Sequence, residues 1–402
     1  MTPQQMAGRV QRISDVSLVV QGRFHAFSLA KGLASRGLRV NLLTNYPASK
    51  VKLWTGADLK IRSFLAHGLL HHGLQRVGLG AKSQRLERLL HESFSRWSAR
   101  QLAKDKTSLI HCFSGVAREI IEQRRGWEIQ PKVVLARGSS HIVEQRKILQ
   151  QEELRAGVHV EKPSDWMVQR ELWEYAFSDH VLVLSEFARH SFLRQGFDSR
   201  RLSMLPLGCD VSRFRATPAM AQERCNRLMQ GRRLNVLGTG SFCLRKGALD
   251  FVSVARAMAS RMDFCWVGDI AKDAHHLAQE AAGLVRFVPR VSEFQLPLAY
   301  QEADLYFFPT LEDGFAVTLV QAMAGAVPIL ASTHSAAPEL LRMGGGWVFE
   351  PRDVSQMLRL LHAADADRQD TVACVEALCD QVLWRDWSEV TDDFIRLYDQ
   401  LV

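Results

Sequence analysis

The sequence predicts an α/β protein made of two doubly wound parallel-sheet domains. The chain has 402 residues, more than one ordinary hydrophobic core accommodates. Short segments that are apolar throughout alternate with longer segments of helical period. Strands of this kind are expected where helices cover both faces of a parallel sheet. A polar segment, 214–233, separates one such series from a second.

The first half opens with a predicted buried strand at 16–20. A helix is expected within 23–37, where apolar residues share one face and Gly37 ends the pattern. Further strands are predicted at 38–44, 108–113, 132–137 and 180–185. The glycine-rich segment 67–80 lacks a strand pattern. It is interpreted as a loop or short helix facing an acceptor or a membrane, with a packed connector as the alternative.

The second half repeats this order. Helices are expected at 247–260 and 274–282, and strands at 234–240, 262–268, 284–289, 303–309 and 326–332. We therefore expect a first domain at 1–213 and a second at 214–384, with a C-terminal helix at about 385–402. Ligands of such sheets bind at the carboxyl ends of the strands, so a site is expected in the cleft between the two facing domains.

Composition narrows the class of protein further. The net charge of +8 favours anionic partners, although solubility alone also explains it. The seven cysteines form no CxxC pair, which argues against a disulfide framework or a structural zinc site and suits a reducing cytoplasm. No apolar run reaches 18 residues, so any membrane contact is expected to be peripheral. A nucleic-acid function would rest on charge alone.

The segment GTGSFCLRKGALDF, 238–251, predicts a phosphate-binding loop. A strand ends at glycines, and Arg245 and Lys246 stand just before a helix. The N-terminus of a helix presents free N–H groups and the positive end of the helix dipole. The segment fits neither a Walker loop nor a GxGxxG fingerprint. Two basic residues before a helix are also common on a solvated surface.

Asp313 and Gly314 begin a second polar turn, ahead of a helix with a buried face. A carboxylate in this place also serves as an ordinary N-cap. Gln321 lies about 12 Å further along the helix axis, at ~1.5 Å per residue, so the two side chains could hold opposite ends of an extended ligand. Glycine at 314 allows a close approach of the backbone.

These segments together resemble family 4 of the retaining glycosyltransferases, which have the two-domain GT-B fold. The segment 303–341, ADLYFFPTLEDGFAVTLVQAMAGAVPILASTHSAAPELL, resembles their donor-binding region, and 238–251 resembles their phosphate loop. LPLGCDVSRF, VLVLSEFARHSF and the C-terminal VLWRDWSEVTDDFIRLYDQLV are similar to other family segments. The resemblance covers most of the chain and is densest in its second half.

The resemblance implies a donor site in the second domain. Lys246 matches the lysine that neutralises the donor diphosphate, and Arg245 is the candidate for a basic residue that the family often has near Gly240. Asp313 matches the acid that contacts the transferred sugar, with Glu312 as a competitor. Gln321 replaces the usual glutamate at the ribose and loses its charge. Backbone N–H groups are expected to help at Gly314, Phe315 and Ala316.

In the first domain the resemblance implies a first loop and a histidine near the reacting carbon. Gly22, Arg23 and His25 occupy the loop. His141 is the candidate for the histidine, and Arg137 is the alternative residue facing the sugar. His111 is a weaker candidate, and packing alone explains any single histidine equally well.

The sequence therefore predicts a metal-independent, cofactor-free hexosyltransferase that uses a nucleotide diphosphate sugar. The acceptor is expected to be a sugar, a polysaccharide or a lipid-linked glycan, in the cytoplasm or at the inner face of the membrane. A non-catalytic nucleotide-sugar-binding or partner protein of the same fold is the alternative. A dehydrogenase is disfavoured because neither half shows GxGxxG followed by an acid about twenty residues later.

Overall fold

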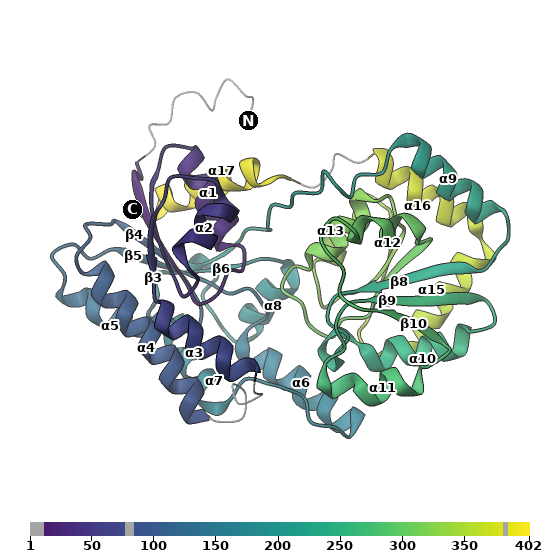
Figure 1. Ribbon diagram of the computed structural model, residues 1–402, viewed down its shortest axis with the longest axis horizontal. Helices are drawn as coiled ribbons and strands as arrows, with labels where there is room; N and C mark the ends of the chain where they lie inside the picture. Colours follow the sequence, from purple (N-terminus) through teal and green to yellow (C-terminus); the bar gives the residue numbers. More distant parts are fainter. Residues whose placement is uncertain (1–11, 77–83, 381–384) are drawn as a thin grey trace.

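The computed structural model describes residues 12–76, 84–380 and 385–402 and contains two parallel sheets lying side by side (Figure 1). The first sheet has seven strands in the order β3-β2-β1-β4-β5-β6-β7. Their bounds are β1 Asp15–Val20, β2 Arg39–Thr44, β3 Lys60–Ser63, β4 Leu109–Phe113, β5 Lys132–Ala136, β6 His180–Val183 and β7 Leu202–Met204. The chain reverses its winding direction between β1 and β4, which is where such sheets bind ligands.

The second sheet has six strands in the order β10-β9-β8-β11-β12-β13, all parallel. Their bounds are β8 Leu234–Thr239, β9 Met262–Val267, β10 Val285–Val288, β11 Leu305–Phe308, β12 Ile329–Ser332 and β13 Gly346–Phe349. Its switch point lies between β8 and β11. The two doubly wound parallel sheets confirm the predicted α/β fold class.

Helices connect the strands and cover both sheets. In the first half they are α1 Ala26–Ser35, α2 Ala48–Thr55, α3 Leu65–Arg76, α4 Gln84–Leu102, α5 Arg118–Gln123, α6 Ile142–Ala156, α7 Asp165–Phe177 and α8 Glu186–Arg194. Those that follow are α9 Pro218–Met229, α10 Ala248–Met258, α11 His275–Glu280, α12 Leu296–Glu302, α13 Val317–Ala324, α14 Ala337–Leu340, α15 Val354–Ala366, α16 Arg368–Asp380 and α17 Trp387–Leu401. None of the helices within the described ranges is long and apolar enough to cross a membrane.

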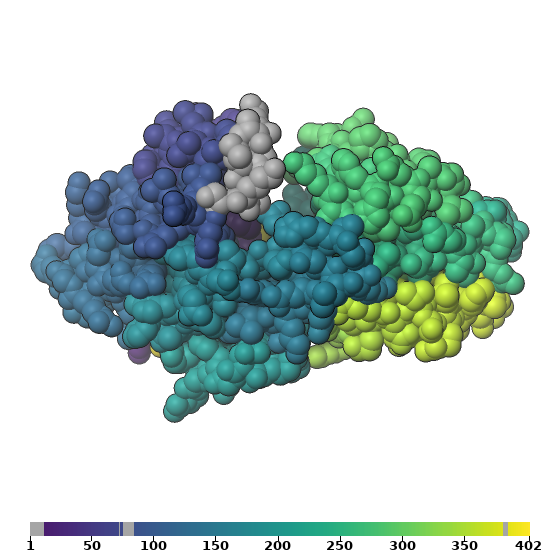
Figure 2. Space-filling view, turned by 90° about the horizontal axis from the view of Figure 1, so that it is seen from below, coloured from purple at the N-terminus to yellow at the C-terminus, as the bar shows by residue number. Residues whose placement is uncertain are grey.

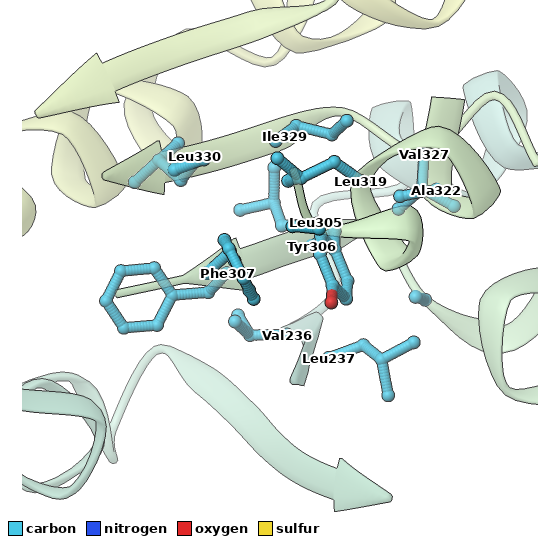
Figure 3. Close-up of a cluster of buried hydrophobic side chains, with 14 of the residues drawn as sticks. Val236, Leu237, Leu305, Tyr306, Phe307, Leu319, Ala322, Val327, Ile329 and Leu330 are labelled. Atoms are coloured by element: carbon cyan, nitrogen blue, oxygen red, sulfur yellow. The ribbon is translucent and has the colours of Figure 1, made fainter. Parts of the chain in front are cut away.

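The strands form because their residues are apolar on both faces. In β1 every residue after Asp15 is buried, as are all residues of β11 and β12. Figure 3 shows the centre of the second sheet, where Leu319 and Ala322 of α13 pack beside β11 and β12. This packing fixes the direction in which α13 leaves the sheet, and with it the loop between β11 and α13.

The last helix, α17, returns to the first sheet. Val390, Phe394 and Leu397 belong to the same apolar core as α1 and β1, and the Tyr398 hydroxyl lies 2.8 Å from His111 Nδ1. Arg36, which directly follows α1, forms an ion pair with Asp392 of α17, with 2.7 Å between Nε and Oδ1. His111 is thus part of the core at β4. The domain bounds of 1–213 and 214–384 stay a prediction.

The segment 67–80 begins as part of α3, and residues 77–80 lie outside the described residues. Lys82 and the side chain of Arg76 also lie outside the described residues. Several leucines of α3 and α4 are exposed: Leu65 48%, Leu69 76%, Leu70 49% and Leu89 59%.

Candidate active site between the two sheets

The loop between β11 and α13 carries Asp313 at the switch point of the second sheet. The Asp313 Oδ1 atom accepts hydrogen bonds from the backbone N–H groups of Phe315 (3.1 Å) and Ala316 (3.0 Å). Ala316 has a positive φ of 62°, and the helix α13 begins at Val317. The carboxylate therefore shapes the turn ahead of the helix with one oxygen and leaves the other oxygen for charged partners.

Lys246 supplies that charged partner. It ends a short 3-10 turn, Leu244–Lys246, after β8, and its Nζ forms an ion pair with Asp313 Oδ2. The turn is possible because Gly247 has a positive φ of 79°, and a Cβ there would lie 1.9 Å from the Pro309 carbonyl oxygen. The loops after β8 and β11 are thus pressed together, which brings the two predicted donor-binding segments to one place.

Arg245, the neighbour of Lys246 in the chain, makes a second contact between the loops after β8 and β11. Its Nη1 donates to the Glu312 carbonyl oxygen at 3.0 Å and lies 3.5 Å from the Glu312 carboxylate. Burial by itself would raise the pKa of the Asp313 carboxyl, but the charges of Lys246 and Arg245 outweigh it, so the net pKa lies below its ordinary value. Asp313 is therefore ionised at neutral pH, and two cations stand beside it.

Glu312 faces the first domain. It is completely buried, and its Oε1 accepts from Ser139 Oγ, from the Ser140 N–H (2.9 Å) and from Ser140 Oγ (3.1 Å). Its Oε2 accepts from Gln145 Nε2 at 3.1 Å. Because these donors occupy both oxygens, the structure gives Glu312 an interdomain contact. The role of Glu312 as a competitor for sugar hydroxyls stays a prediction.

Gly314 and Gly240 mark close approaches of the backbone. A Cβ on Gly314 would lie 2.1 Å from the Gly138 carbonyl oxygen, so the loops of the two domains touch. Gly240 follows β8 with φ 104°, and its carbonyl oxygen accepts from Trp266 Nε1 at 2.9 Å. Both glycines therefore stand where the predicted donor loops turn.

Gln321 is half-buried and points into a cluster of hydroxyl groups. Its Oε1 accepts from the Tyr300 hydroxyl at 3.1 Å. The Thr239 hydroxyl lies 3.2 Å from the Tyr300 hydroxyl and 2.9 Å from the Tyr306 hydroxyl. Among the described residues the Gln321 amide nitrogen donates no hydrogen bond to this cluster, so we expect the amide nitrogen to be the group that turns toward a ligand. Sequence analysis missed Tyr300 and Thr239.

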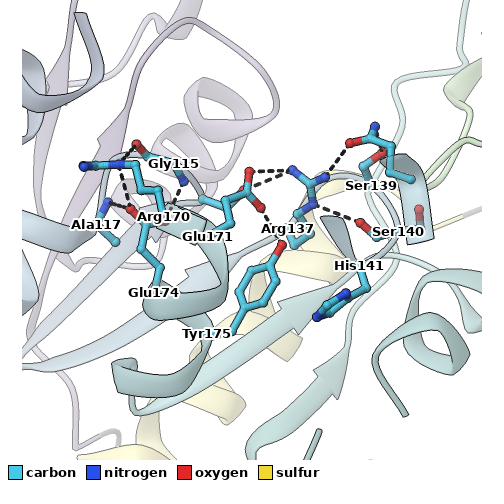
Figure 4. Close-up of polar contacts among 12 residues, drawn as sticks. Gly115, Ala117, Arg137, Ser139, Ser140, His141, Arg170, Glu171, Glu174 and Tyr175 are labelled. Carbon is cyan, nitrogen blue, oxygen red and sulfur yellow. Dashed lines mark hydrogen bonds and ion pairs between the residues drawn. The ribbon is translucent and has the colours of Figure 1, made fainter. Parts of the chain in front are cut away.

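Arg137 directly follows β5 in the first sheet and is held by a buried network (Figure 4). Its Nη1 lies 2.9 Å from Glu171 Oε1, its Nη2 donates to Gln145 Oε1 at 2.7 Å, and its Nε donates to the Ser140 carbonyl oxygen at 3.0 Å. Glu171 in turn accepts from the Tyr175 hydroxyl. All three nitrogens of the guanidinium group thus have protein partners, and Arg137 is linked to Glu312 of the second domain through both Gln145 and Ser140.

His141 caps α6 and lies in an aromatic pocket. Its side chain is 4% exposed, and its ring centroid lies 5.1 Å from that of Tyr175 and 4.8 Å from that of Phe192. Burial, together with the nearby charge of Arg137, lowers the pKa of His141 to about 4. Figure 4 shows the imidazole beside the Tyr175 ring. A catalytic role for His141 stays a prediction, and these contacts are those of a packing residue.

The first-loop residues form a separate cluster at the carboxyl end of β1. The Gly22 N–H donates to Asn45 Oδ1 at 2.9 Å, and the Arg23 guanidinium lies over the Trp54 ring at 4.7 Å. The His25 ring lies 4.8 Å from the Phe113 ring, and its Nε2 is buried with no hydrogen-bond partner among the described residues. Phe24, which sequence analysis did not single out as a site residue, stacks on Phe113 at 5.6 Å and is 70% exposed.

In the ranges 12–76, 84–380 and 385–402, no three His, Cys, Asp or Glu side chains gather as metal ligands would. The expectation of a metal-independent, cofactor-free reaction stays a prediction.

Comparisons with known proteins agree with the architecture. Residues 233–364 match the sequence family described as glycosyl transferases group 1. A GDP-mannose-dependent phosphatidylinositol monomannoside mannosyltransferase from Mycobacterium tuberculosis is 26% identical over 211 residues, which are 49% of this chain and 55% of that protein. The chain therefore spans about half the length of the curated relatives it matches.

Solved structures match over almost the whole chain. The sucrose-phosphate synthase of Thermosynechococcus elongatus aligns with a TM-score of 0.73 and 18% identity, covering 96% of this chain and 99% of that one. HepE of Anabaena, solved with UDP and glucose, aligns with a TM-score of 0.66 and 13% identity, covering 96% and 100%. Residues 233–364 thus match the family of glycosyl transferases group 1, in a chain that has the two-domain GT-B fold.

Proposed function

We propose that this chain is a retaining glycosyltransferase that moves a hexosyl group from a nucleotide diphosphate sugar onto a sugar, polysaccharide or lipid-linked acceptor. The observation that carries the proposal is the pairing of Lys246 with Asp313 where the loops after β8 and β11 meet. A cation for phosphate and a carboxylate for sugar hydroxyls stand side by side, at the switch point where doubly wound sheets bind ligands.

The departing group of this reaction is a nucleoside diphosphate, which gains negative charge as the bond to the sugar breaks. Lys246 and Arg245 are placed to stabilise that charge, and the N-terminus of α10 begins just after them at Ala248. Fixed charges in a buried site stabilise a transition state without reorganising at the moment of reaction. Arg245 keeps 37% of its side chain exposed, so it remains reachable from the cleft.

Asp313 is the residue that would hold the sugar. Its carboxylate is ionised, and Oδ2, which pairs with Lys246, has a further lone pair that can accept from a sugar hydroxyl group. Donor binding brings a diphosphate to Lys246, which then bridges the phosphate and Asp313 and keeps the two negative groups apart. Gln321 would hold the ribose by accepting and donating neutral hydrogen bonds.

The reaction is a substitution on one face of the sugar. The bond from C1 to the phosphate oxygen breaks, and the acceptor oxygen forms its bond to C1 on the same side. The acceptor hydroxyl gives its proton to the departing phosphate oxygen. This step therefore requires no separate carboxylate base, which agrees with the engagement of both Glu312 oxygens by the first domain.

The acceptor would reach the cleft from the first domain. We include a peripheral membrane contact through α3 and α4 in the proposal, because exposed leucines there lie near the exposed Arg85 and Arg88. Apolar side chains beside basic ones suit an anionic lipid surface. Sedimentation with phosphatidylglycerol vesicles tests this: Leu69→Glu should weaken binding, and equal binding to phosphatidylcholine vesicles alone would count against it.

The function is tested in two stages. A thermal-shift screen of nucleotide sugars should identify a donor that raises the melting temperature, since a ligand that binds only the folded state stabilises it. Release of nucleoside diphosphate is then measured with that donor and a panel of acceptors. Acceptor-dependent release supports the proposal. Tight donor binding with neither transfer nor hydrolysis would instead identify a binding protein of the same fold.

A further inference from the structure

One face of α6 docks onto the second domain. Gln145, Ile148, Glu152 and Arg155 follow each other at spacings of three, four and three residues, so they form a stripe along the helix. Each of these four residues contacts a residue of the second domain. Figure 1 places α6 below the boundary between the two sheets, and Figure 2, seen from below, shows the blue-teal part of the first half of the chain lying against the green part of the second half.

The C-terminal part of the stripe anchors α6. Glu152 is completely buried, and its Oε2 lies 2.9 Å from Arg352 Nε. Arg155 forms an ion pair with Asp250 of α10, with 3.1 Å between Nη1 and Oδ2. Ile148 packs in a small apolar cluster with Leu311 of the loop between β11 and α13, which we call the donor loop. These contacts hold α6 against the second domain independently of its first turn.

The first turn of α6 reaches the donor loop through Gln145. Its Oε1 accepts from Arg137 Nη2 at 2.7 Å. Its Nε2 donates to Ser139 Oγ at 3.0 Å and to Glu312 Oε2 at 3.1 Å. The amide is therefore oriented by its partners: its oxygen must face Arg137, and its nitrogen must face the carboxylate.

Glu312 links Gln145 to the proposed donor site. Its neighbour in the chain is Asp313, and its carbonyl oxygen accepts from Arg245 at 3.0 Å. A completely buried carboxylate is stable only while donors surround it, and here most of the donors come from the first domain. If the first domain moves away, Glu312 loses these donors and the loop that carries Asp313 loses its support.

We propose that Gln145 is a positioning residue that fixes Glu312, and through it the Asp313 loop and Arg245, only when the two domains are closed. This inference rests on the proposed glycosyl transfer, because the loop it positions is the proposed donor site. The donor site of the second domain is then complete only when it contacts the first domain. Bound donor therefore reacts only in the closed form.

The test replaces Gln145 by its charged isostere. Gln145→Glu keeps the shape and the contact with Arg137, but it sets a carboxylate opposite Glu312 and so favours the open form. The donor cations belong to the second domain, so we expect donor affinity to change by less than about threefold while kcat falls more than about tenfold. Small-angle scattering with donor bound should show a larger radius of gyration than that of the wild type.

The reciprocal exchange supplies the rescue. Gln145→Glu combined with Glu312→Gln restores one donor and one acceptor across the interface, so kcat and the radius of gyration should return toward wild-type values. Gln150→Glu is the matched control, because Gln150 lies exposed on the same helix. Gln145→Met, which removes the polar atoms without adding charge, serves if Gln145→Glu fails to fold by circular dichroism.

The outcomes separate this inference from the proposed function. Wild-type protein that closes on a donor but transfers nothing would contradict the proposed function, and the scattering comparison would still decide the role of Gln145. Normal kcat and an unchanged radius of gyration in Gln145→Glu would overturn the inference alone. An exchange variant no better than the single one would also overturn it.

Discussion

The loop after β11 in the second domain and the loop after β5 in the first domain meet in the cleft, yet they are built differently. In the second domain Lys246 and Asp313 pair with each other at the ends of adjacent strands. In the first domain Arg137 is committed to Glu171, Gln145 and Ser140, and His141 is committed to Tyr175 and Phe192. The charged pair of the β11 loop joins two loops of the second domain, whereas the charge of Arg137 is held by partners within the first domain.

This difference separates residues that act on a ligand from residues that support them. A charged pair at the switch point can exchange its partner for a phosphate or a sugar hydroxyl. A guanidinium with three protein partners would have to give up several hydrogen bonds to do the same, at about 1–3 kcal/mol each. Substitutions in the two loops test whether the β11 loop contacts the ligand and the β5 loop supports it.

The largest expected effect is that of Lys246→Ala. We expect kcat to fall about 10²–10³-fold, as it does when a single preorganised group that stabilises transition-state charge is removed. The unpaired Asp313 would also repel the donor diphosphate. Transfer kinetics are compared with those of Lys272→Ala, an exposed lysine on the turn before α11. Near-normal kinetics in folded Lys246→Ala would contradict the assignment of Lys246 to the donor diphosphate.

Asp313→Asn should have the next largest effect. The amide oxygen can still accept from the Phe315 and Ala316 N–H groups, so the turn is preserved, but the charge beside Lys246 is lost. We expect a loss of roughly 10–10²-fold in kcat/KM, corresponding to about 1.4–2.8 kcal/mol. Steady-state kinetics measure it, with circular dichroism as the control for folding. An unchanged kcat/KM would place the sugar contact elsewhere.

His141→Gln tests the first-domain loop. From its contacts we expect destabilisation of roughly 1–3 kcal/mol, as for other changes in buried packing, with a smaller effect on kcat than Asp313→Asn. The lowered pKa of His141, about 4, means that the unfolded state binds protons first as the pH falls below about 6.5. Wild-type stability should therefore drop from pH 7 to pH 5, and the variant should lose part of that drop.

Denaturant unfolding at the two pH values measures this effect, with kcat recorded in parallel. A loss of kcat as large as that of Asp313→Asn, at unchanged stability, would instead establish His141 as the residue at the reacting carbon. That result would reverse the division of work between the two loops.

The smallest expected effect is that of Gln321→Glu. A carboxylate can accept from Tyr300 as the amide does, and it adds a charge-assisted hydrogen bond to the ribose. The gain is roughly 1 kcal/mol, or about fivefold in donor affinity. Isothermal titration with the donor checks it, with Tyr300→Phe as the variant that removes the existing partner. A large loss of affinity in a folded variant would count against the ribose role.

The same contrast explains how much the sequence could predict. The strands and the phosphate loop follow from local patterns: apolar runs, a glycine at a left-handed turn, and cations before a helix. The meeting of Lys246 and Asp313 follows from strand order, because β8 and β11 are neighbours. These features depend on residues that are close in the chain or on a regular sheet.

The interface residues could not be predicted in this way. Three residues, Gln145, Ser139 and Ser140, bind Glu312, which lies more than 160 residues further along the sequence. They come into contact with Glu312 only through the packing of the two domains. The pattern near His141 indicated a histidine after a strand, but its ring direction depends on Tyr175 and Phe192 in other helices. Side-chain direction of this kind is a tertiary property, and a local pattern does not carry it.

The central claim is that the paired Lys246 and Asp313 serve glycosyl transfer with retention of configuration. Proton NMR of the reaction with an α-linked nucleotide sugar and an acceptor follows the anomeric signal directly. The account predicts an initial product with the α configuration for the wild type, and its loss in Lys246→Ala. A β-configured initial product, or bound donor that is neither transferred nor hydrolysed, would contradict it.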